Sequence, residues 1–538
     1  MDSDRAPLSG RGFRALSYGV PLAFLALFFV FPLAAILERG LRSEGDLASP
    51  LDVVTDPVTR EVVWFTAWQA VASTALTILV ALPAAYVLGR FAFPGRALVR
   101  ALVVVPFVLP TVVVALAFLA LLPDGLERGW AAILVAHAFF NIAVVVRVVG
   151  TFWAGLDPRV SEAASTLGAG PWRRLREVTL PLLAPSLAAA AAVVFLFSFT
   201  SFGVVLILGG PSYSTIEAEI YNQAVRLFDL RAAAILSLVQ LACVALTVWI
   251  TLRLETRLSV AGHLRSERET LRRPRTRREW AVVAGSLGAL GLFLGLPLAV
   301  LVERSLAVGD GHGLDAYREL TRPTSALLAT PWEAVVNSVV YAAAATAIAV
   351  VVGGLAAFAI AGTRGGRVLD GLLMLPLGAS AVMLGFGFVI AFDRWPVDFR
   401  SEPWIVPVVQ ALVALPFVVR AVAPTLRAID ERQREAAALL GASPGRVRRE
   451  IDLPIVGRAL AVAAGFAFAI SLGEFGATVF LARPDSPTLP VAIFRFLGRP
   501  GELNAAQAYA LAVILMGVTV VSVVLVERIR RRGNGGWI

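Results

Sequence analysis

The sequence contains no lysine, so all 48 basic residues among its 538 are arginines. A phosphate-binding P-loop has the pattern Gly-x-x-x-x-Gly-Lys followed by Ser or Thr, and its lysine reaches the phosphates of the nucleotide. Without lysine the chain does not carry this motif. The chain therefore cannot be an ATPase of this kind by itself, and hydrolysis by such a motif would need a separate protein.

Cysteine, histidine and charged residues are also scarce. The one cysteine is Cys243 and the three histidines are scattered, which excludes an intrachain disulfide and a multi-cysteine metal site. No clustered catalytic constellation is evident, so we expect no enzyme activity, no metal and no cofactor. Charged residues make up 16% of the sequence, whereas a soluble protein has about 25%. With 58% hydrophobic residues, the chain is predicted to be an all-α membrane protein.

Twelve apolar runs are long enough to span a bilayer, which takes about 20 residues in a helix. The first run resembles a signal sequence, but it continues to Leu37 without a clear cleavage site. We therefore interpret it as a retained span. The predicted spans are residues 18–38, 62–89, 99–122, 130–154, 182–209, 232–252, 281–302, 333–361, 368–392, 404–426, 455–482 and 505–526.

Arginines cluster in alternate loops, and this bias sets the orientation of the spans. Basic segments at 90–100, 157–177, 253–278 and 427–450 alternate with segments richer in acidic residues, and basic loops face the cytoplasm. Twelve spans with both termini in the cytoplasm satisfy this pattern. Because these loops explain the net charge of +10, we do not expect nucleic-acid binding.

An internal repeat at an offset of 273 residues relates the two halves of the chain. Residues 157–181 align with 430–454 without a gap, and 14 of the 25 positions are identical. The same offset relates Ser198 to Ser471. Each half has six spans, an even number, so the two halves have the same orientation and form a parallel repeat.

The repeat predicts three segments. Residues 1–252 form the first six-helix half, and residues 280–538 form the second. Residues 253–279 form a polar, arginine-rich cytoplasmic linker that we expect to be a solvated tether.

The repeated loop lies between the fourth and fifth spans of each half and is longer than a plain connector requires. The stretch from Glu162 predicts a short helix that ends at Gly168. Pro171 suits the start of a second helix, which we expect to end near Pro181. The result is a helix–turn–helix elbow at the membrane surface, with small alanines that let a partner approach. A simpler alternative is an elbow that only joins two spans, but the duplication favours two equivalent contacts with a dimeric partner.

Both copies resemble the EAA loop of ABC importer permeases. The resemblance is carried by Glu162-Ala163-Ala164, Gly168 and Leu180-Pro181, and again by Glu435-Ala436-Ala437, Gly441 and Leu453-Pro454. In that family the loop forms a coupling helix that docks into a groove on the nucleotide-binding subunit. The coupling residues that the resemblance implies are Glu162, Ala163, Ala164, Gly168, Pro171, Arg173, Glu435, Ala436, Ala437, Gly441, Pro444 and Arg446.

The resemblance covers nearly the whole chain and implies the type I ABC importer permease fold, as in the fused two-half permeases of thiamine and iron(III) importers. It implies a dimer of cytoplasmic ATP-binding subunits and an extracytoplasmic solute-binding protein as partners. It also implies a multi-pass location in the cytoplasmic membrane of a prokaryote. In this family ATP draws the two elbows together, and the permease then imports a small solute by alternating access.

Polar residues inside the spans are candidates for the translocation path. Glu474 is the one carboxylate found well inside a span, and it is either a path or gating residue or a carboxylate that packs helices. The candidate path residues are Glu474, Ser198, Ser201, Ser471 and Asn141. The residues expected instead to hold helices together are His137, Gln69, Gln240, Gln410 and Asn337.

The cargo is left open. Residues 200–221 and Thr488-Leu489-Pro490 resemble the thiamine importer permease, which favours thiamine or its phosphates. Residues 471–478 are also similar to molybdate- and sulfate-type permeases and to some iron(III) permeases, so iron(III) is the alternative. A secondary transporter driven by an ion gradient also uses two parallel six-span halves, but the duplicated elbow argues against it.

Overall fold

The structure, a computed structural model, describes residues 11–41, 50–258, 270–308, 311–324, 326–362, 365–393 and 402–533. These residues are almost entirely helical, and the one sheet among them pairs two short antiparallel strands, β1 (Ala307–Val308) and β2 (Gly311–His312). Residues 259–269 of the predicted linker lie outside the described residues. The predicted all-α membrane architecture is confirmed.

Within the described residues, ten continuous helical segments are long and apolar enough to cross a membrane. Two further pairs of helices pass the same test together but bend by 98° and 95° at their junctions. Counting each bent pair as one span gives the twelve spans that hydropathy predicts. The ten segments are Gly12–Leu41, Pro57–Arg90, Trp130–Gly155, Pro171–Phe199, Leu230–Thr251, Arg277–Leu306, Pro331–Gly362, Ile405–Arg427, Pro444–Gly473 and Glu502–Ile529.

Most of these segments are single helices. The first is composite and contains α1 (Arg11–Leu25), the π-helical turn η1 (Ala26–Val30) and α2 (Phe31–Leu41). The single helices are α4 (Pro57–Arg90), α8 (Trp130–Gly155), α14 (Leu230–Leu258), α16 (Arg277–Leu306), α18 (Pro331–Gly362), α21 (Ile405–Arg427) and α27 (Glu502–Gly533). Short elements outside the spans are α3 (Pro50–Thr55), α17 (Asp315–Arg318) and the 3-10 turn η4 (Glu319–Thr321).

Each bent pair breaks at a local backbone signal that hydropathy does not register. Pro110 holds Leu109 in an extended conformation. Ser380 Oγ accepts a hydrogen bond from Met383 N at 3.0 Å and so caps the second arm of its pair. The spans predicted at 99–122 and 368–392 are therefore bent. Their arms are α5 (Arg96–Leu102), α6 (Val105–Val108) and α7 (Thr111–Leu121) in the first pair, and α19 (Gly366–Gly378) and α20 (Ala381–Ala391) in the second.

The fifth and eleventh spans begin and end earlier than predicted. The second helix of each elbow does not end near its Leu-Pro pair but continues into the span. A π-helical turn just before the proline adjusts the backbone around a residue that lacks an N–H. The continuous stretches are α10 (Pro171–Arg174), η2 (Leu175–Thr179) and α11 (Leu180–Phe199), and likewise α23 (Pro444–Val447), η6 (Arg448–Asp452) and α24 (Leu453–Gly473).

These two spans were predicted to reach residues 209 and 482, but they end at Phe199 and Gly473. The apolar sequence continues past both ends, so hydropathy gave no sign of the break. Short elements follow instead, namely α12 (Gly203–Leu208), α13 (Ile216–Tyr221) and the π turn η3 (Asn222–Arg226), and then α25 (Thr478–Leu481) and α26 (Leu489–Leu497).

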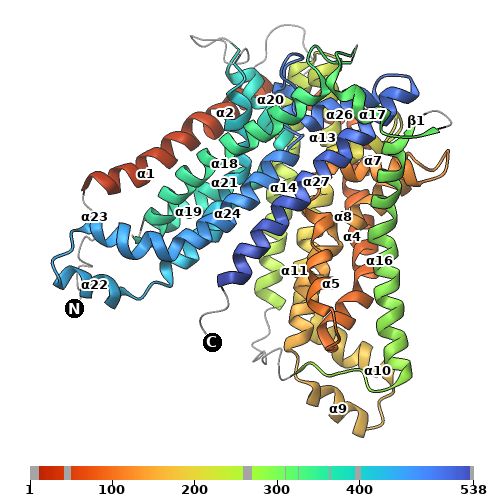
Figure 1. The fold of residues 1–538 in the computed structure, drawn as a ribbon, viewed down its shortest axis with the longest axis vertical. Coiled ribbons are helices and arrows are strands. Elements are labelled where there is room, and N and C mark those ends of the chain that lie inside the picture. Colours follow the sequence, from red (N-terminus) through yellow and green to blue (C-terminus); the bar gives the residue numbers. More distant parts are fainter. Residues whose placement is uncertain are drawn as a thin grey trace. The chain divides into compact units, whose positions relative to one another are not determined.

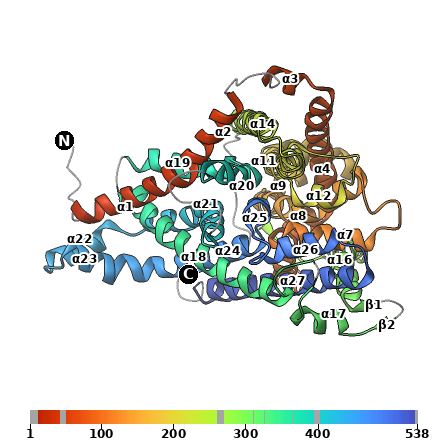
Figure 2. The ribbon, with the colours of Figure 1, turned by 90° about the horizontal axis from the view of Figure 1, so that it is seen from above.

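The chain forms two compact units in which the opening span of each half packs with helices of the other half. In unit 1, α2 lies beside α20 (Figure 2), and Phe28 stacks on Phe388 with ring centroids 6.1 Å apart. In unit 2, α16 lies beside α4 (Figure 1). The division into 1–252, 253–279 and 280–538 stays a prediction about the duplicated sequence. Unit 1 contains the described residues of Met1–Glu44, Ala224–Ala234 and Leu314–Ile538, and unit 2 contains those of Gly45–Gln223 and Ile235–Gly313.

Corresponding helices pack closely in both units. Helix α4 packs on α8 and α11 in unit 2, and α18 packs on α21 and α24 in unit 1. A Cβ atom added at Gly89 of α4 would lie 2.9 Å from Gly150 O of α8, and one added at Gly353 of α18 would lie 2.9 Å from Val418 Cγ1 of α21. Membrane helices associate through such small residues, and here they fix the helices from which the elbows extend.

Candidate functional site

The first elbow (157–181) begins with a short helix, α9 (Pro158–Thr166), that is capped at both ends. Asp157 Oδ1 accepts a hydrogen bond from Arg159 N at 3.0 Å, as an N-cap residue does. The chain leaves the helix at Gly168, whose φ of 83° lies in the left-handed region. Ala169 N then donates to Ala164 O at 3.0 Å, which makes the turn a Schellman C-cap.

The second elbow (430–454) repeats this geometry around α22 (Glu431–Leu439). Asp430 Oδ1 accepts from Arg432 N at 3.0 Å, Gly441 has a φ of 82°, and Ala442 N donates to Ala437 O at 3.0 Å. A residue with a Cβ atom pays about 1–2 kcal/mol for this left-handed conformation. The duplicated glycine is therefore the residue that lets both elbows turn.

The residues predicted to couple the chain to an ATPase lie on these elbows, and all are exposed or half-exposed. On the second helix of each elbow, Arg173 pairs with Glu177 at 2.8 Å and Arg446 pairs with Glu450 at 3.0 Å. Pairs this exposed contribute at most about 1 kcal/mol to stability, so the four side chains are free to exchange partners with an approaching surface.

Each elbow also exposes large apolar side chains. Leu167 and its repeat mate Leu440 are each 88% exposed, and Leu439 is 89% exposed. These are the three most exposed large apolar side chains among the described residues. In each unit, taken separately, the elbow lies at the end away from the short helices α13 or α26 (Figure 1). The two elbows thus share an exposed leucine at the same repeat position.

Three of the five candidate path residues meet in a buried polar cluster of unit 2. His137 lies between two hydroxyls, with Ser73 Oγ 3.0 Å from Nδ1 and Ser201 Oγ 2.8 Å from Nε2. Asn141 Nδ2 donates to His137 O at 3.1 Å and to Ser198 Oγ at 3.5 Å. All five side chains are buried. We call these five residues the His137 cluster.

Gln69 of α4 joins the His137 cluster by donating from Nε2 to Ser198 O at 2.8 Å. It therefore holds α4 to the end of α11, as expected. Gln69 Oε1 and Asn141 Oδ1 are buried and have no hydrogen-bond partner among the described residues. The cluster and Gln69 together thus have two buried acceptors without a partner among the described residues.

Two other amides predicted to hold helices together make contacts outside their own helices. Gln240 Nε2 donates to Glu217 Oε1 at 3.0 Å, and Asn337 Nδ2 donates to Pro487 O at 3.5 Å. Gln410, the repeat mate of His137, is buried, and its Oε1 has no partner among the described residues.

The remaining candidate path residues, Ser471 and Glu474, occupy the corresponding place in unit 1. Glu474 does not lie inside a span as predicted, because α24 ends one residue before it. Its carboxylate accepts hydrogen bonds from Ala477 N at 2.7 Å and Thr478 N at 3.0 Å, which are amides at the start of α25 that have no partner within that helix. Its repeat mate is Ser201, so the two units place a carboxylate and a hydroxyl at equivalent breaks.

Two buried hydroxyls that the sequence analysis missed fix the short helices beyond these breaks. Thr66 Oγ1 of α4 accepts from Ile216 N of α13 at 3.0 Å. Ser338 Oγ of α18 accepts from Leu489 N of α26 at 2.6 Å. Ile216 and Leu489 are 273 residues apart, whereas Thr66 and Ser338 are 272 apart, so comparison at a single offset hid the second pair.

The described residues hold no group of three or more His, Cys, Asp or Glu side chains able to bind a metal ion. The polar chemistry described for both units therefore consists of hydroxyls, amides, one imidazole and carboxylates. These groups donate and accept hydrogen bonds to helix ends and to one another.

Residues 81–260 and 334–533 match the family described as "Binding-protein-dependent transport system inner membrane component". The thiamine transport system permease protein of Brucella abortus (strain 2308) is 31% identical over 95% of this chain and 94% of its own length. The protein of the same name from Escherichia coli (strain K12) is 28% identical over 86% of this chain and 88% of its own length. The sulfate transport system permease protein of Salmonella typhimurium (strain LT2) is 34% identical, but over 46% of this chain and 95% of its own length.

We expect Gly168→Ala and Gly441→Ala each to loosen the elbow that contains it. A Cβ atom at a φ near +80° strains the turn, so the capping amide, Ala169 N in the first elbow and Ala442 N in the second, should exchange about tenfold faster. Hydrogen–deuterium exchange of the purified chain measures this. Gly170→Ala is the matched control, because Gly170 has a φ of −64° and open space around an added Cβ. Equal exchange in Gly168→Ala and Gly170→Ala would contradict the capping role.

We expect His137→Leu to destabilise the helices joined by the His137 cluster. The change leaves two buried hydroxyls without their shared partner, which costs about 1–3 kcal/mol. Thermal unfolding in detergent measures the loss. His137→Gln, which introduces the residue found at the equivalent position 410, should recover part of it, and His312→Leu at an exposed site should have little effect. A midpoint for His137→Leu as high as that of His312→Leu would refute this.

Proposed function

The chain belongs to the family of binding-protein-dependent transport system inner membrane components, and we propose that it imports thiamine or a thiamine phosphate with energy from a separate ATPase. The observation that carries the proposal is the second elbow, which has the same caps, the same left-handed glycine and the same exposed leucine as the first. Two equivalent contact surfaces suit a partner that is itself a symmetric dimer.

The proposed docking partner is a cytoplasmic dimer of ATP-binding subunits. Each elbow offers it an exposed leucine, exposed alanine and arginine side chains, and a glycine turn. Because the chain has no lysine and hence no P-loop, hydrolysis by that motif falls to the partner. The proposed contact residues are Glu162, Ala163, Ala164, Gly168, Pro171 and Arg173 on the first elbow, and Glu435, Ala436, Ala437, Gly441, Pro444 and Arg446 on the second.

Continuity of the helices supports a direct mechanical route from elbow to span. No break separates α10 from α11 or α23 from α24, so movement of a docked subunit would be passed straight to the fifth or eleventh span. Ser198 and Ser471 lie near the far ends of these two helices. ATP-driven closure of the partner would thus act on the buried polar positions of both units.

We propose that the candidate path residues line the cargo route once the spans have moved. They are buried in the described state, so cargo reaches them only through a change of conformation. The two spare acceptors in the first half, Gln69 Oε1 and Asn141 Oδ1, could then accept hydrogen bonds from cargo. The residues concerned are Asn141, Ser198, Ser201, Ser471 and Glu474.

The arginine-rich elbows favour an orientation with both elbows and both termini in the cytoplasm. The opposite face, with the loops that precede α4 and α18, would receive the cargo from an extracytoplasmic solute-binding protein. This orientation fits the cytoplasmic membrane of a prokaryote.

Thiamine is favoured as cargo because relatives bearing the thiamine name align with 95% and 86% of this chain, whereas the sulfate relative aligns with 46%. The family resemblance of residues 471–478 keeps iron(III) as the alternative. Both solutes can be presented to the same reconstituted complex.

If the elbows dock an ATPase, Leu167→Ser combined with Leu440→Ser should prevent the ATP-binding subunits from co-purifying with the chain. Losing two leucine contacts removes several kcal/mol of apolar burial, so binding should weaken by about a hundredfold or more. Leu328→Ser is the matched control, because this leucine is 82% exposed on a loop that the orientation places on the opposite face. Undiminished recovery of the ATPase with the double variant would argue against elbow docking.

Transport in proteoliposomes tests the cargo. The chain, its ATP-binding subunits and its solute-binding protein should move labelled thiamine only when ATP is supplied on the elbow side. Iron(III) and sulfate are offered in parallel under the same conditions. Uptake driven by an ion gradient without ATP would overturn the importer, and ATP-driven uptake of iron(III) but not thiamine would overturn the cargo.

A further inference from the structure

The linker between the two halves is not simply a solvated tether, because residues 270–276 pack against the ends of helices within unit 2, to which they belong. Residue 272 forms a parallel bridge with residue 91. Ala92 N donates to Arg272 O at 2.9 Å, and Arg272 N donates to Arg90 O at 3.2 Å. This segment, which we call the linker clasp, is therefore bound through its backbone to the end of α4.

A buried hydroxyl binds the linker clasp to a second helix. Thr270 is 5% exposed, and its Oγ1 donates to Ala154 O, next to the last residue of α8. Asp157, the N-cap of the first elbow, lies three residues further along the chain. The clasp thus contacts the helix end from which the first elbow starts.

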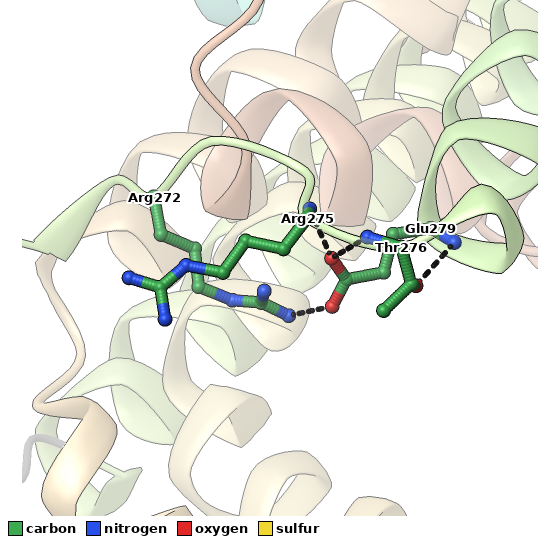
Figure 3. A network of polar contacts seen from close by, with 4 residues as sticks. All are labelled: Arg272, Arg275, Thr276 and Glu279. Atoms are coloured by element: carbon green, nitrogen blue, oxygen red, sulfur yellow. Dashed lines mark hydrogen bonds and ion pairs between the residues drawn. The ribbon is translucent and has the colours of Figure 1, made fainter.

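Side chains bind the linker clasp to a third helix, α16. Arg272 Nη2 donates to Glu279 Oε1 at 2.6 Å, and Glu279 Oε2 accepts from Arg275 N at 2.7 Å (Figure 3). Thr276 and Glu279 form a reciprocal capping box at the start of α16. The Arg272 guanidinium also lies 5.0 Å from the centroid of the Phe91 ring, and Phe91 itself is buried.

These contacts join the ends of α4, α8 and α16 at one place beside the first elbow. The elbow starts three residues after Ala154, and moving the end of α8 away from α4 and α16 would break the hydrogen bond from Thr270 or the bridge at residue 91. The first elbow therefore starts from a helix end that the linker clasp holds against two other helices.

The second elbow is braced in a different way. Arg434 Nε donates to Asp452 Oδ1 at 2.8 Å, and the two side chains are only 19% and 7% exposed. Arg448 also lies 4.0 Å from the centroid of the Phe13 ring. At the offset of 273 the first elbow has Ser161, Thr179 and Leu175 in place of Arg434, Asp452 and Arg448, so it can form neither contact.

We infer that the linker clasp positions the first elbow for coupling and replaces the ion pair that braces the second. The positioning residues are Thr270, Arg272 and Glu279. Thr270 acts through the end of α8, Arg272 through the end of α4, and Glu279 through the start of α16. The importance of this brace for transport rests on the proposed function, but its effect on the elbow does not.

Hydrogen–deuterium exchange of the full-length chain tests the clasp without any partner. Thr270→Val removes the hydrogen bond to Ala154 O, and Glu279→Gln replaces the carboxylate that accepts from Arg272 and Arg275 by a neutral amide. Each change should raise the exchange rate of residues 157–168 about fivefold. Residues 430–441 should keep their wild-type rates. Thr270→Ser, which retains the hydroxyl, should restore slow exchange, and Asp452→Asn should give the reciprocal pattern with the second elbow loosened.

Equal rates at the first elbow in wild type and both clasp variants would overturn the inference, as would an equal rise at the two elbows. In the reconstituted complex the clasp variants should also carry less thiamine per ATP hydrolysed than wild type. A wild-type complex that moves no thiamine would refute the proposed function, yet the exchange rates would still decide the clasp.

Discussion

Backbone groups that leave a helix inside a membrane need a partner from the protein, because hydrocarbon supplies none. This chain interrupts its fifth and eleventh spans and bends its third and ninth, and buried polar side chains serve the freed amides. Thr66 serves the first amide of α13, Ser338 that of α26, and Glu474 those at the start of α25. These three buried polar side chains therefore lie where their partners leave a helix.

The duplication preserves the backbone but changes the polar side chains where the fifth and eleventh spans end. In both units a long helix ends at the equivalent place. A buried hydroxyl of the preceding helix, α4 or α18, then binds the first amide of a later short helix, α13 or α26. At the break itself the first half has His137 with Ser201, and the second has Gln410 with Glu474. The imidazole joins two hydroxyls within its cluster, whereas the carboxylate caps a helix within its own segment. The two halves therefore have equivalent backbones but different buried polar side chains.

Sequence alone could predict the features that depend on local signals. The number of spans follows from apolar length, and the elbow turns follow from Gly168 and Gly441 between two helix-forming stretches. Hydropathy placed Glu474 inside a span because the apolar run continues past Gly473, although the helix stops there. Which helices each opening span packs against depends on tertiary contacts, and no periodicity in the sequence predicts it. The linker clasp could not be predicted from the sequence for a similar reason, because Arg272 and Glu279 are two of many charged residues in a polar linker.

Stiffness in the elbows must come from buried contacts, because exposed ion pairs contribute too little. The Arg173–Glu177 and Arg446–Glu450 pairs are conserved between the two elbows but lie in solvent, where their net contribution is about 0–1 kcal/mol. The contacts able to resist displacement are the nearly buried Arg434–Asp452 pair and the buried Thr270 hydroxyl. These contacts are not duplicated. A fused chain has one linker, so a brace built from the linker can serve only one of two otherwise equal elbows, and the other must carry its brace within its own sequence.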